Sequence, residues 1–560
     1  MDYKQYVAEK IKIDGVSAEE IRQMLTVPPT REMGDFALPC FTFAKTMRKS
    51  PALIAEALAS SIVPDDVIES VSALSGYLNF KISRRGMVAE VLQRVRSEGA
   101  AYGSSREGAG RVICIDYSSI NIAKPFHIGH LMTTVIGGAL YRIFNFLGYK
   151  AVGINHLGDW GTQFGKLISA YKRWGDKETI EKGRVRELMK IYVRFHEEAE
   201  KDPSLEDEAR AYFKKIEEGD EECLALFHWF RDLTLVDVQK IYDLLNIHFD
   251  SYAGESFYND KMQPVIDKLE EKGLLKESDG AKVVDLEAYG MPPCLILKAD
   301  GATLYATRDL AAAFYRKEHY NFYKCLYVVA YQQNLHFKQI FKVLELMGAD
   351  FYKDMEHVAY GMVSLPGGAM STRKGNVVFL SDVIDTCIEK SAKLIEEKNP
   401  ALENKEEVSR MVGTAAVIFG ALSNSKIKDV VFDINKVTNF DGETGPYVQY
   451  TVARANSVLE KAGTYTENYD VDVTESEYEI VSLLEKFPEA VRSACEKREP
   501  SLVTRYAADL AQAYNTFYFA CKILDAEENV RAFRLTLSDA VKTVLTTALG
   551  LLGIDVPAKM

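Results

Sequence analysis

The most restrictive feature of the sequence is a short apolar run that ends in a polar turn, a pattern that occurs three times. The runs open the segments RVICIDYSS (111–119), KAVGINHLGDWG (150–161) and KCLYVVAYQQNLHF (324–337). Short apolar runs bounded by loop residues are typical of strands buried in a parallel sheet. Helical segments follow the first and third runs, and the first of them ends at Gly148. Such strand–turn–helix units predict a parallel α/β sheet that binds ligands beyond the carboxyl ends of its strands.

The rest of the chain predicts further domains around this sheet. At 560 residues the chain is too long for a single core. Residues 1–105 combine helical periodicity with the strand-like run GYLNFKI and predict a small α+β domain. We expect a Rossmann-type domain over residues 106–390, with a charged helical insertion at about 165–285. Helical periodicity over residues 391–560 predicts an all-α bundle that ends near Gly553.

The composition argues against several functional classes. Sixty-eight basic and 81 acidic residues give a net charge of −13, which is unsuited to coating nucleic acid through bulk charge but allows a local basic face for a structured RNA. No apolar run approaches the roughly 18 residues of a membrane helix. The charged N-terminus is unlike a secretory signal, so we expect a cytoplasmic protein without a membrane segment. Eight singly scattered cysteines predict neither a disulfide framework nor a zinc ribbon.

The stretch NIAKPFHIGH (121–130) gathers a lysine, a proline and two histidines around one glycine. His127 and His130 are three residues apart, and Pro125 suits the first turn of a helix, so we expect both imidazoles on one face near a helix N-terminus. Free amides at such a terminus favour an anion, and Gly129 lets it approach the backbone closely. With Lys124 beside the histidines, the stretch predicts a site for nucleotide phosphates. Two surface histidines without a ligand are the structural alternative.

Several motifs along the chain resemble those of one family and occur in its order. SSINIAKPFHIGH (118–130) resembles the first signature of class I aminoacyl-tRNA synthetases, in the form found in arginyl-tRNA synthetases. MSTRKGNVV (370–378) is similar to their second signature loop, usually written KMSKS. The resemblance covers essentially the whole chain and extends to NHLGDWGTQFG, ESFYND, LYATRDLAAA, YVVAYQQNLHF, FDGETGPYVQYTVAR and LLGIDVPAKM.

The resemblance implies an ATP- and Mg²⁺-dependent ligase. Enzymes of this family join L-arginine to ATP, release pyrophosphate, and pass the arginyl group to the terminal ribose of tRNA(Arg). Neither step needs an enzyme nucleophile, because the arginine carboxylate attacks the α-phosphorus and a ribose hydroxyl then attacks the acyl adenylate. The protein must align these reactants and stabilise charge on phosphate, for which imidazoles, a helix N-terminus and basic side chains are suited. The resemblance also implies a monomer.

A pocket for arginine should contain carboxylates and neutral acceptors, because a guanidinium presents five donors in a planar fork. By resemblance, the pocket would be lined by Asp116, Ser119, Asn121, Tyr305, Asp309 and Gln333. The two aspartates would meet the guanidinium, and Ser119 and Asn121 are better placed for the α-amino and carboxylate end. Lysine cannot pair with such a site as a planar fork, so we expect it to be rejected. The structural alternative is an ordinary ion pair, since Asp309 follows Arg308.

The second signature loop departs from its usual pattern. Aligned on KMSKS, the loop keeps Met370 and Ser371 but has Ala369 and Thr372 where lysines are usual. By resemblance, Met370 and Ser371 belong to the ATP site, and the charge that faces pyrophosphate would come from the next two residues, Arg373 and Lys374, or from Lys124. A solvated basic turn is the structural alternative.

For tRNA the sequence indicates less. GYLNFKI resembles the segment with which this family contacts the tRNA elbow, so Tyr77 and Asn79 are candidates for a base contact. A tyrosine packed on its own sheet is the alternative. The resemblance also implies an anticodon site in the helical domain, where the aromatic stripe of Tyr506 and Tyr514 is more typical of a core.

Other functions are compatible with parts of this pattern. They include a class I synthetase for a different amino acid, a plain nucleotidyltransferase and a catalytically silent tRNA-binding relative. The paired acidic positions 116 and 309 argue against the first two, and intact signature residues argue against the third. A zinc hydrolase would need ligands beyond His127, His130 and His156, and the sequence supplies no cysteine or second His-x-x-His to complete the set, so no metal ligand is predicted.

Overall fold

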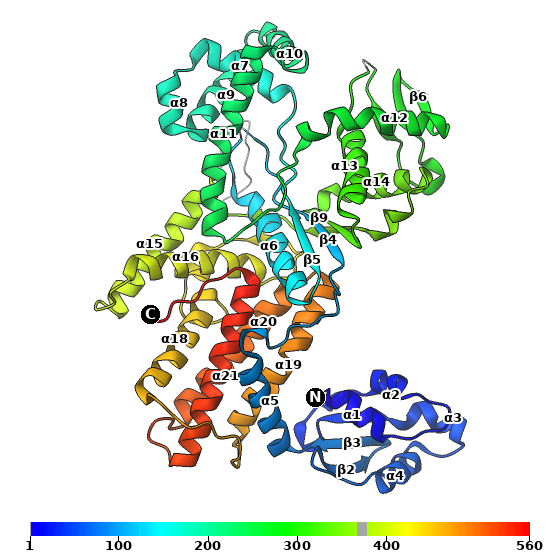
Figure 1. The fold of residues 1–560 in the computed structure, drawn as a ribbon, viewed down its shortest axis with the longest axis vertical. Coiled ribbons are helices and arrows are strands. Elements are labelled where there is room, and N and C mark those ends of the chain that lie inside the picture. Colours follow the sequence, from blue (N-terminus) through cyan, green and yellow to red (C-terminus); the bar gives the residue numbers. More distant parts are fainter. Residues whose placement is uncertain (1, 123, 300, 367–377) are drawn as a thin grey trace. The chain divides into compact units, whose positions relative to one another are not determined.

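The computed structural model describes residues 2–122, 124–299, 301–366 and 378–560, which group into two compact units (Figure 1). Unit 1 comprises Met1–Tyr102, Arg454–Phe487 and Gln512–Val544, and unit 2 comprises Gly103–Ala453, Pro488–Ala511 and Leu545–Met560. Four long helices contribute residues to both units: α18 (Gly445–Ala462), α19 (Glu475–Lys497), α20 (Ser501–Ala520) and α21 (Glu528–Leu552).

Unit 1 contains a three-stranded antiparallel sheet in the order β1–β3–β2. β3 (Tyr77–Ile82) is the central strand, between β1 (Phe36–Pro39) and β2 (Ile68–Leu74). The two residues between β2 and β3, Ser75 and Gly76, both have positive φ, as a tight hairpin requires. The helices of this part of the chain are α1 (Tyr3–Lys10), α2 (Ala18–Met24), α3 (Ala44–Met47), α4 (Pro51–Ser61) and α5 (Arg84–Glu98).

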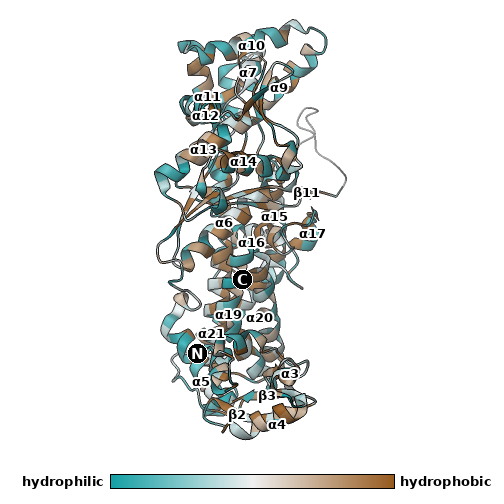
Figure 2. Cartoon of the chain, turned by 90° about the vertical axis from the view of Figure 1, so that its right-hand side faces the viewer, coloured by the Kyte–Doolittle hydropathy of each residue, from teal (hydrophilic) through white to brown (hydrophobic). Residues whose placement is uncertain are grey.

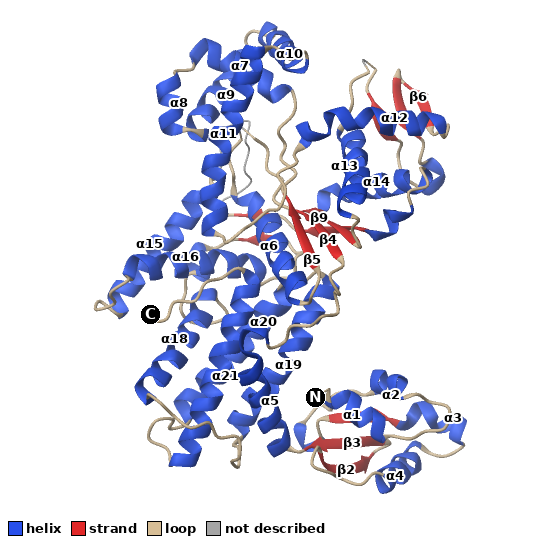
Figure 3. Ribbon diagram, in the orientation of Figure 1, coloured by secondary structure: helices blue, strands red, loops and turns tan. Residues whose placement is uncertain are grey.

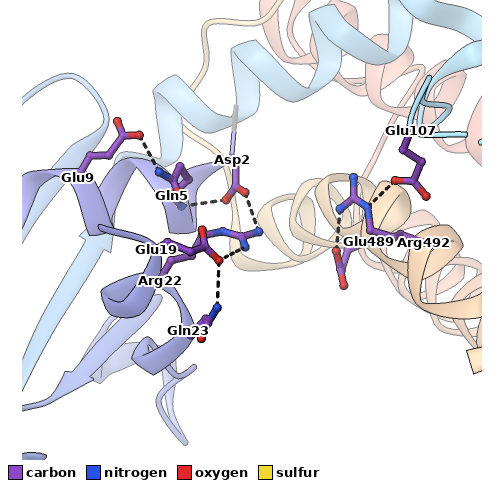
Figure 4. A network of polar contacts seen from close by, with 9 residues as sticks. All are labelled: Asp2, Gln5, Glu9, Glu19, Arg22, Gln23, Glu107, Glu489 and Arg492. Carbon is purple, nitrogen blue, oxygen red and sulfur yellow. Dashed lines mark hydrogen bonds and ion pairs between the residues drawn. The ribbon is translucent and has the colours of Figure 1, made fainter. Parts of the chain in front are cut away.

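Polar contacts orient the first two helices of unit 1 (Figure 4). The carboxylate of Asp2 caps α1 by accepting from the backbone N–H of Gln5 at 2.9 Å, and it pairs with Arg22 of α2 at 3.0 Å. Arg22 also lies 3.7 Å from Glu19. Exposed ion pairs of this kind contribute about 0–1 kcal/mol each. They therefore link the two helices at the surface and add little to the stability of the fold.

The predicted parallel sheet lies in unit 2, with the strand order β10–β9–β4–β5 and only parallel pairings (Figure 3). Its strands are β4 (Val112–Asp116), β5 (Lys150–Ile154), β9 (Lys324–Ala330) and β10 (Met355–Tyr360). The first three are the runs that the sequence indicated, and the predicted parallel α/β domain is confirmed. α6 (Leu131–Phe146) connects β4 to β5, and α14 (Asn334–Leu346) connects β9 to β10.

The strand order defines where this sheet binds ligands. From β4 the chain adds β5 on one side, whereas β9 pairs on the other side of β4. Connections therefore leave the carboxyl ends of β4 and β9 in different directions and open a crevice between them, which is the usual ligand position in open α/β sheets. Asp116 is the last residue of β4, and the loop after β9 contains Gln333.

The chain between β5 and α13 (Tyr305–Tyr320) forms an inserted region of helices and a small antiparallel sheet. The expected helical insertion at about 165–285 is mainly helical as far as Glu271, but its end belongs to the sheet β6–β7–β8. The hairpin between β6 and β7 turns at Asp279 and Gly280, both with positive φ, which is the Asp-Gly turn signal. Figure 2 shows hydrophilic and hydrophobic residues alternating along α10, as expected for a helix with one buried face. The region comprises α7 (Thr162–Trp174), α8 (Lys177–Gly183), α9 (Val185–Ala199), α10 (Ser204–Glu217), α11 (Glu221–Leu244), α12 (Met262–Glu271), β6 (Leu275–Ser278), β7 (Ala281–Val284) and β8 (Cys294–Leu297).

After the sheet the chain is almost entirely helical, as predicted. Besides α18 to α21 it forms α15 (Leu380–Lys398), α16 (Lys405–Leu422), α17 (Ile434–Val437) and a two-residue pairing of β11 (Val363–Ser364) with β12 (Val430–Val431). Within α20, Tyr506 and Tyr514 are buried, as expected for core residues. α21 is long and apolar enough to cross a membrane, but 67% of its most apolar window is buried inside the structure. It is therefore best explained as a core helix.

Candidate active site

The two histidines lie in the turn that connects β4 to α6. A 3₁₀ turn, η4 (Ile128–His130), precedes α6, which begins at Leu131. The prediction that Pro125 occupies the first helical turn is therefore wrong, because His127 acts as a cap instead: its Nδ1 accepts from the backbone N–H of Gly129 at 3.0 Å. A Cβ at position 129 would lie 2.8 Å from the His127 ring, so any other residue there would push this ring out of place.

Both imidazoles use Nδ1 as an acceptor and carry their proton on Nε2. His130 Nδ1 accepts from the backbone N–H of His127 at 3.2 Å, and the ring centroids are 3.9 Å apart. Burial, helped by the neighbouring His127, lowers the pKa of His130 to about 3, and burial also lowers the pKa of His127. At neutral pH the pair is uncharged and presents two Nε2–H donors. Two such donors at the start of a helix suit phosphate oxygens.

The second signature segment ends beside these histidines. Phe379 forms an antiparallel bridge with His127, and Ile128 donates its backbone N–H to the carbonyl of Val378 at 3.3 Å. Leu380 likewise donates to the carbonyl of Phe126 at 2.8 Å. The C-terminal end of the loop is therefore anchored at the first signature. The loop positions named from the sequence lie outside the described residues: Ala369, Met370, Ser371, Thr372, Arg373 and Lys374.

At the end of β4, each oxygen of the Asp116 carboxylate holds a donor from this chain. Oδ2 accepts from Arg316 of α13 at 2.7 Å, and Oδ1 accepts from the Ser119 hydroxyl at 2.7 Å. The Asp116 and Arg316 side chains are 7% and 1% exposed. Burial opposes the charge of Arg316, but Asp116, together with the neighbouring Tyr327 and Tyr258, outweighs it and raises the pKa of the guanidinium. A buried ion pair thus stands where the sequence predicted a contact to substrate.

The second predicted carboxylate, Asp309, lies one turn after Tyr305 on α13, so the two residues share a helix face. His336 of α14 bonds to Asp309 through Nε2 at 2.5 Å, and each of these side chains is 25% exposed. Burial opposes ionisation of Asp309, but the hydrogen bond and charge of His336, together with His156 and Arg316, outweigh it and lower the pKa of the carboxyl group. Asp309 is therefore a charged carboxylate with part of its surface open. Tyr305 and Gln333 are exposed.

The two aspartates belong to one charged cluster at the crevice. His156, which follows β5, lies 3.4 Å from Arg316 through Nδ1 and interacts electrostatically with both Asp116 and Asp309. Burial lowers the pKa of His156, which keeps it neutral. The crevice between β4 and β9 therefore contains two carboxylates, one guanidinium and a neutral imidazole.

A third carboxylate, Glu255, faces this cluster from the inserted region. It is 9% exposed, interacts electrostatically with Asp309 and Tyr305, and lies 3.7 Å from Arg308. Burial raises its pKa to about 7, although Arg308 acts in the opposite direction. A carboxyl group at the edge of a charged crevice whose pKa lies close to neutral pH is a candidate for ligand contact.

Two further predicted residues lie along the segment from β4 to the histidines. Asn121 is exposed and bridges to Gly158, where an added Cβ would lie 2.5 Å from the Asn121 side-chain oxygen. Gly158 is thus needed for Asn121 to pack here. Lys124 is half-buried and close enough to His127 to help lower its pKa.

The sequence did not single out three side chains of this cluster, Glu255, Arg316 and His336, and it considered His156 only as a ligand in the zinc alternative. Glu255 and His336 fall within the quoted motifs ESFYND and YVVAYQQNLHF, which could have signalled them. Arg316 had no such signal, because its partner Asp116 is 200 residues away.

In unit 1 the two residues proposed for a base contact differ in how exposed their side chains are. Tyr77 is 40% exposed and packs edge-to-face on Phe41 at 5.2 Å between ring centroids. Asn79, on the same face of β3, is 5% exposed. Tyr77 is thus accessible to a ligand, whereas Asn79 is enclosed by its own unit.

Comparison with known proteins matches this organisation over the whole chain. Family models match three regions: the catalytic domain of class I tRNA synthetases (R) over residues 91–434, the DALR anticodon-binding domain over 448–560 and the N-terminal domain of arginyl-tRNA synthetases over 1–82. The chain belongs to the class I arginyl-tRNA synthetase family. The resemblance drawn from the signatures is confirmed.

Relatives in this family match from end to end. The arginine–tRNA ligases of Alkaliphilus metalliredigens and Clostridium botulinum are each 53% identical, with 100% of both chains covered. Among solved structures, the arginyl-tRNA synthetase of Thermus thermophilus is 26% identical, with 96% of each chain covered and a TM-score of 0.81. A Mycobacterium tuberculosis methionyl-tRNA synthetase, 11% identical over 79% of this chain with a TM-score of 0.50, shares the fold alone.

Proposed function

We propose that the chain is an arginine–tRNA ligase that activates L-arginine with ATP and transfers it to tRNA(Arg). The observation that carries this proposal is the crevice between β4 and β9. One side of it is a phosphate-type site with two neutral imidazoles, and the other is a group of carboxylates suited to a guanidinium. The two sides match the two ends of an arginyl adenylate, its phosphate and its guanidinium. Attachment of labelled arginine to tRNA(Arg) by the purified protein tests the proposal, and failure with tRNA that a related enzyme can charge would refute it.

In the first step the arginine carboxylate attacks the α-phosphorus of ATP and pyrophosphate leaves. The Nε2–H groups of His127 and His130 donate to phosphate oxygens, and the positive end of the α6 dipole adds to the attraction. Lys124 supplies positive charge next to the histidines, together with Arg373 and Lys374 of the second signature loop, whose Met370 and Ser371 complete the ATP site. We expect Mg²⁺ to enter as its complex with ATP, since in such sites phosphates and water hold most of this ion's coordination positions.

The amino acid lies toward the carboxylates. Asp309 meets the guanidinium, Tyr305 and Gln333 flank it from exposed positions, and the segment of Ser119 and Asn121 receives the α-amino and carboxylate end. Lysine would offer a single ammonium in place of a planar fork and would leave acceptors unpaired, so it is rejected. The protein acts as a cytoplasmic monomer, with the tRNA elbow on unit 1 near Tyr77.

The affinity for arginine should follow the ionisation of Glu255. Its pKa of about 7 leaves the carboxyl group mostly protonated at pH 6 and mostly ionised at pH 8. A guanidinium prefers the ionised form, so the KM for arginine should fall about tenfold over this range and level off above it. Steady-state activation assays at each pH measure this change. In Glu255→Gln the dependence should disappear, and an unchanged slope in that variant would show that another group titrates.

Loss of the Tyr77 ring should weaken tRNA binding selectively. Base stacking on an aromatic ring contributes roughly 1–3 kcal/mol, so Tyr77→Ala should raise the KM for tRNA about tenfold. Tyr77→Phe keeps the ring and serves as the matched control, with little change expected. The KM for arginine should stay the same in both variants. Equal KM values for tRNA in Tyr77→Ala and the wild type would remove this residue from the interface.

A further inference from the structure

We propose that Arg316 is a positioning residue for the arginine site. It holds Asp116, and Asp116 in turn holds the turn of Ser118 and Ser119. The substrate guanidinium binds to Asp309 and not to Asp116. This inference rests on the proposed function. It assigns Asp116 a role different from direct contact with the guanidinium, which the sequence had suggested.

The first support is the state of the Asp116 carboxylate. One oxygen accepts from Arg316 and the other from Ser119, each at 2.7 Å, and the ion pair is almost completely buried. A second guanidinium would have to enter beside these donors, at a carboxylate whose side chain is only 7% exposed. Asp309, in contrast, accepts from His336 and keeps a quarter of its side-chain surface open. Of the two aspartates, Asp309 is the one that can receive a ligand.

The second support is the backbone that follows Asp116. Ser118 and Ser119 have φ of +67° and +44°, a left-handed conformation that L-residues adopt at a cost. Ser118 is fixed on one side, because its N–H donates to Thr133 and its hydroxyl bonds to Tyr242. The Ser119 hydroxyl bonds to Asp116. The ion pair is thus the second anchor of a strained turn, and this turn leads into Asn121 and the histidines.

The third support is the geometry of α13. Arg316 lies seven residues after Asp309, two helical turns along the same face. One helix therefore delivers Asp309 to the open part of the crevice and Arg316 to the end of β4. The same helix thus supports both the proposed guanidinium contact and the anchor of the turn.

The contact between Arg316 and Asp116 is made through one nitrogen. Nη2 carries the ion pair, and it also lies 3.4 Å from His156, whereas Nε and Nη1 have no hydrogen-bond partner among the described residues. Because the contact is not bidentate, an ammonium can replace it in part. This predicts that lysine, unlike an uncharged side chain, preserves the function of the residue.

The test is a double-mutant cycle of Arg316→Met and Asp116→Asn, measured as arginine activation. Each single change should lower kcat/KM for arginine at least tenfold, and the double variant should be no worse than the poorer single variant, because both remove the same anchor. Arg316→Lys should recover most of the loss, and the KM for ATP should stay within twofold of the wild type in all variants. The inference would be overturned if the losses in kcat/KM of the two single variants multiplied in the double variant. It would also be overturned if Arg316→Lys were as impaired as Arg316→Met.

A ligand that has only the guanidinium end gives the decisive second measurement. Butylguanidine lacks the α-amino and carboxylate groups, so its inhibition constant should be unchanged in Asp116→Asn and should rise at least tenfold in Asp309→Asn. A rise in Asp116→Asn would mean that Asp116 contacts the guanidinium directly. This measurement stands even if Arg316→Met fails to fold. Wild-type protein that activates no amino acid would refute the proposed function instead, so the two failures are distinguishable.

Discussion

Replacing His130 by leucine is expected to lower kcat for arginine activation about 10²–10³-fold, the usual cost of removing one preorganised donor from developing negative charge. In the structure His130 is neutral, with a pKa of about 3, and its Nδ1 is occupied by the backbone N–H of His127. Only Nε2–H is left to face a ligand. The KM for arginine should change little, because the imidazole belongs to the phosphate side of the crevice.

His130→Gln is the matched control for this change. Its amide can place a donor near the position of Nε2, but it loses the acceptor for the His127 backbone just as leucine does. The difference between the two variants therefore isolates the donor, and glutamine should retain at least tenfold more activity. Single-turnover formation of the adenylate measures it. Equal rates in the leucine and glutamine variants would mean that His130 acts only by shaping the turn.

Replacing Asp309 by asparagine is expected to raise the KM for arginine about 10²-fold, since removing one partner of a hydrogen-bonded charge pair in a desolvated site costs roughly 2–5 kcal/mol. Asp309 is ionised and partly open, and its bond to His336 fixes its direction. The KM for ATP should not change, because the phosphate site lies on the other side of the crevice.

Citrulline provides the matched substrate for Asp309→Asn. It has the shape of arginine but a neutral urea group, so the preference for arginine over citrulline should fall sharply in the asparagine variant. Competition assays with the two amino acids measure the ratio. If the ratio and the KM for arginine both stay within threefold of the wild type, Asp309 serves only as the partner of His336.

Local patterns predicted the parts of the fold that depend on neighbouring residues. The buried strands 112–116, 150–154 and 324–330 are apolar runs between turns. The signature of His127 and His130 indicated the pair of imidazoles that we propose binds the phosphates of ATP. Each of these features is encoded within about a dozen consecutive residues.

The features that local patterns did not predict depend on distant contacts or on competing caps. Asp116 was assigned to the substrate, but Arg316 on a helix 200 residues later lies against it. The helix after Pro125 begins only at Leu131, because the His127 side chain satisfies the backbone N–H of Gly129 first. Charged residues on a helix are usually solvated, so nothing in the sequence distinguished Arg316 from its neighbours.

The most direct test of the account is pyrophosphate release from ATP by the purified protein, with a panel of amino acids, each with and without tRNA(Arg). Release with arginine alone among the amino acids, rising when tRNA is added, is the predicted result. It would follow from a crevice that pairs a phosphate site with carboxylates for a guanidinium. Absence of release with every amino acid in the presence of tRNA(Arg), or equal release with lysine, would contradict the proposed function.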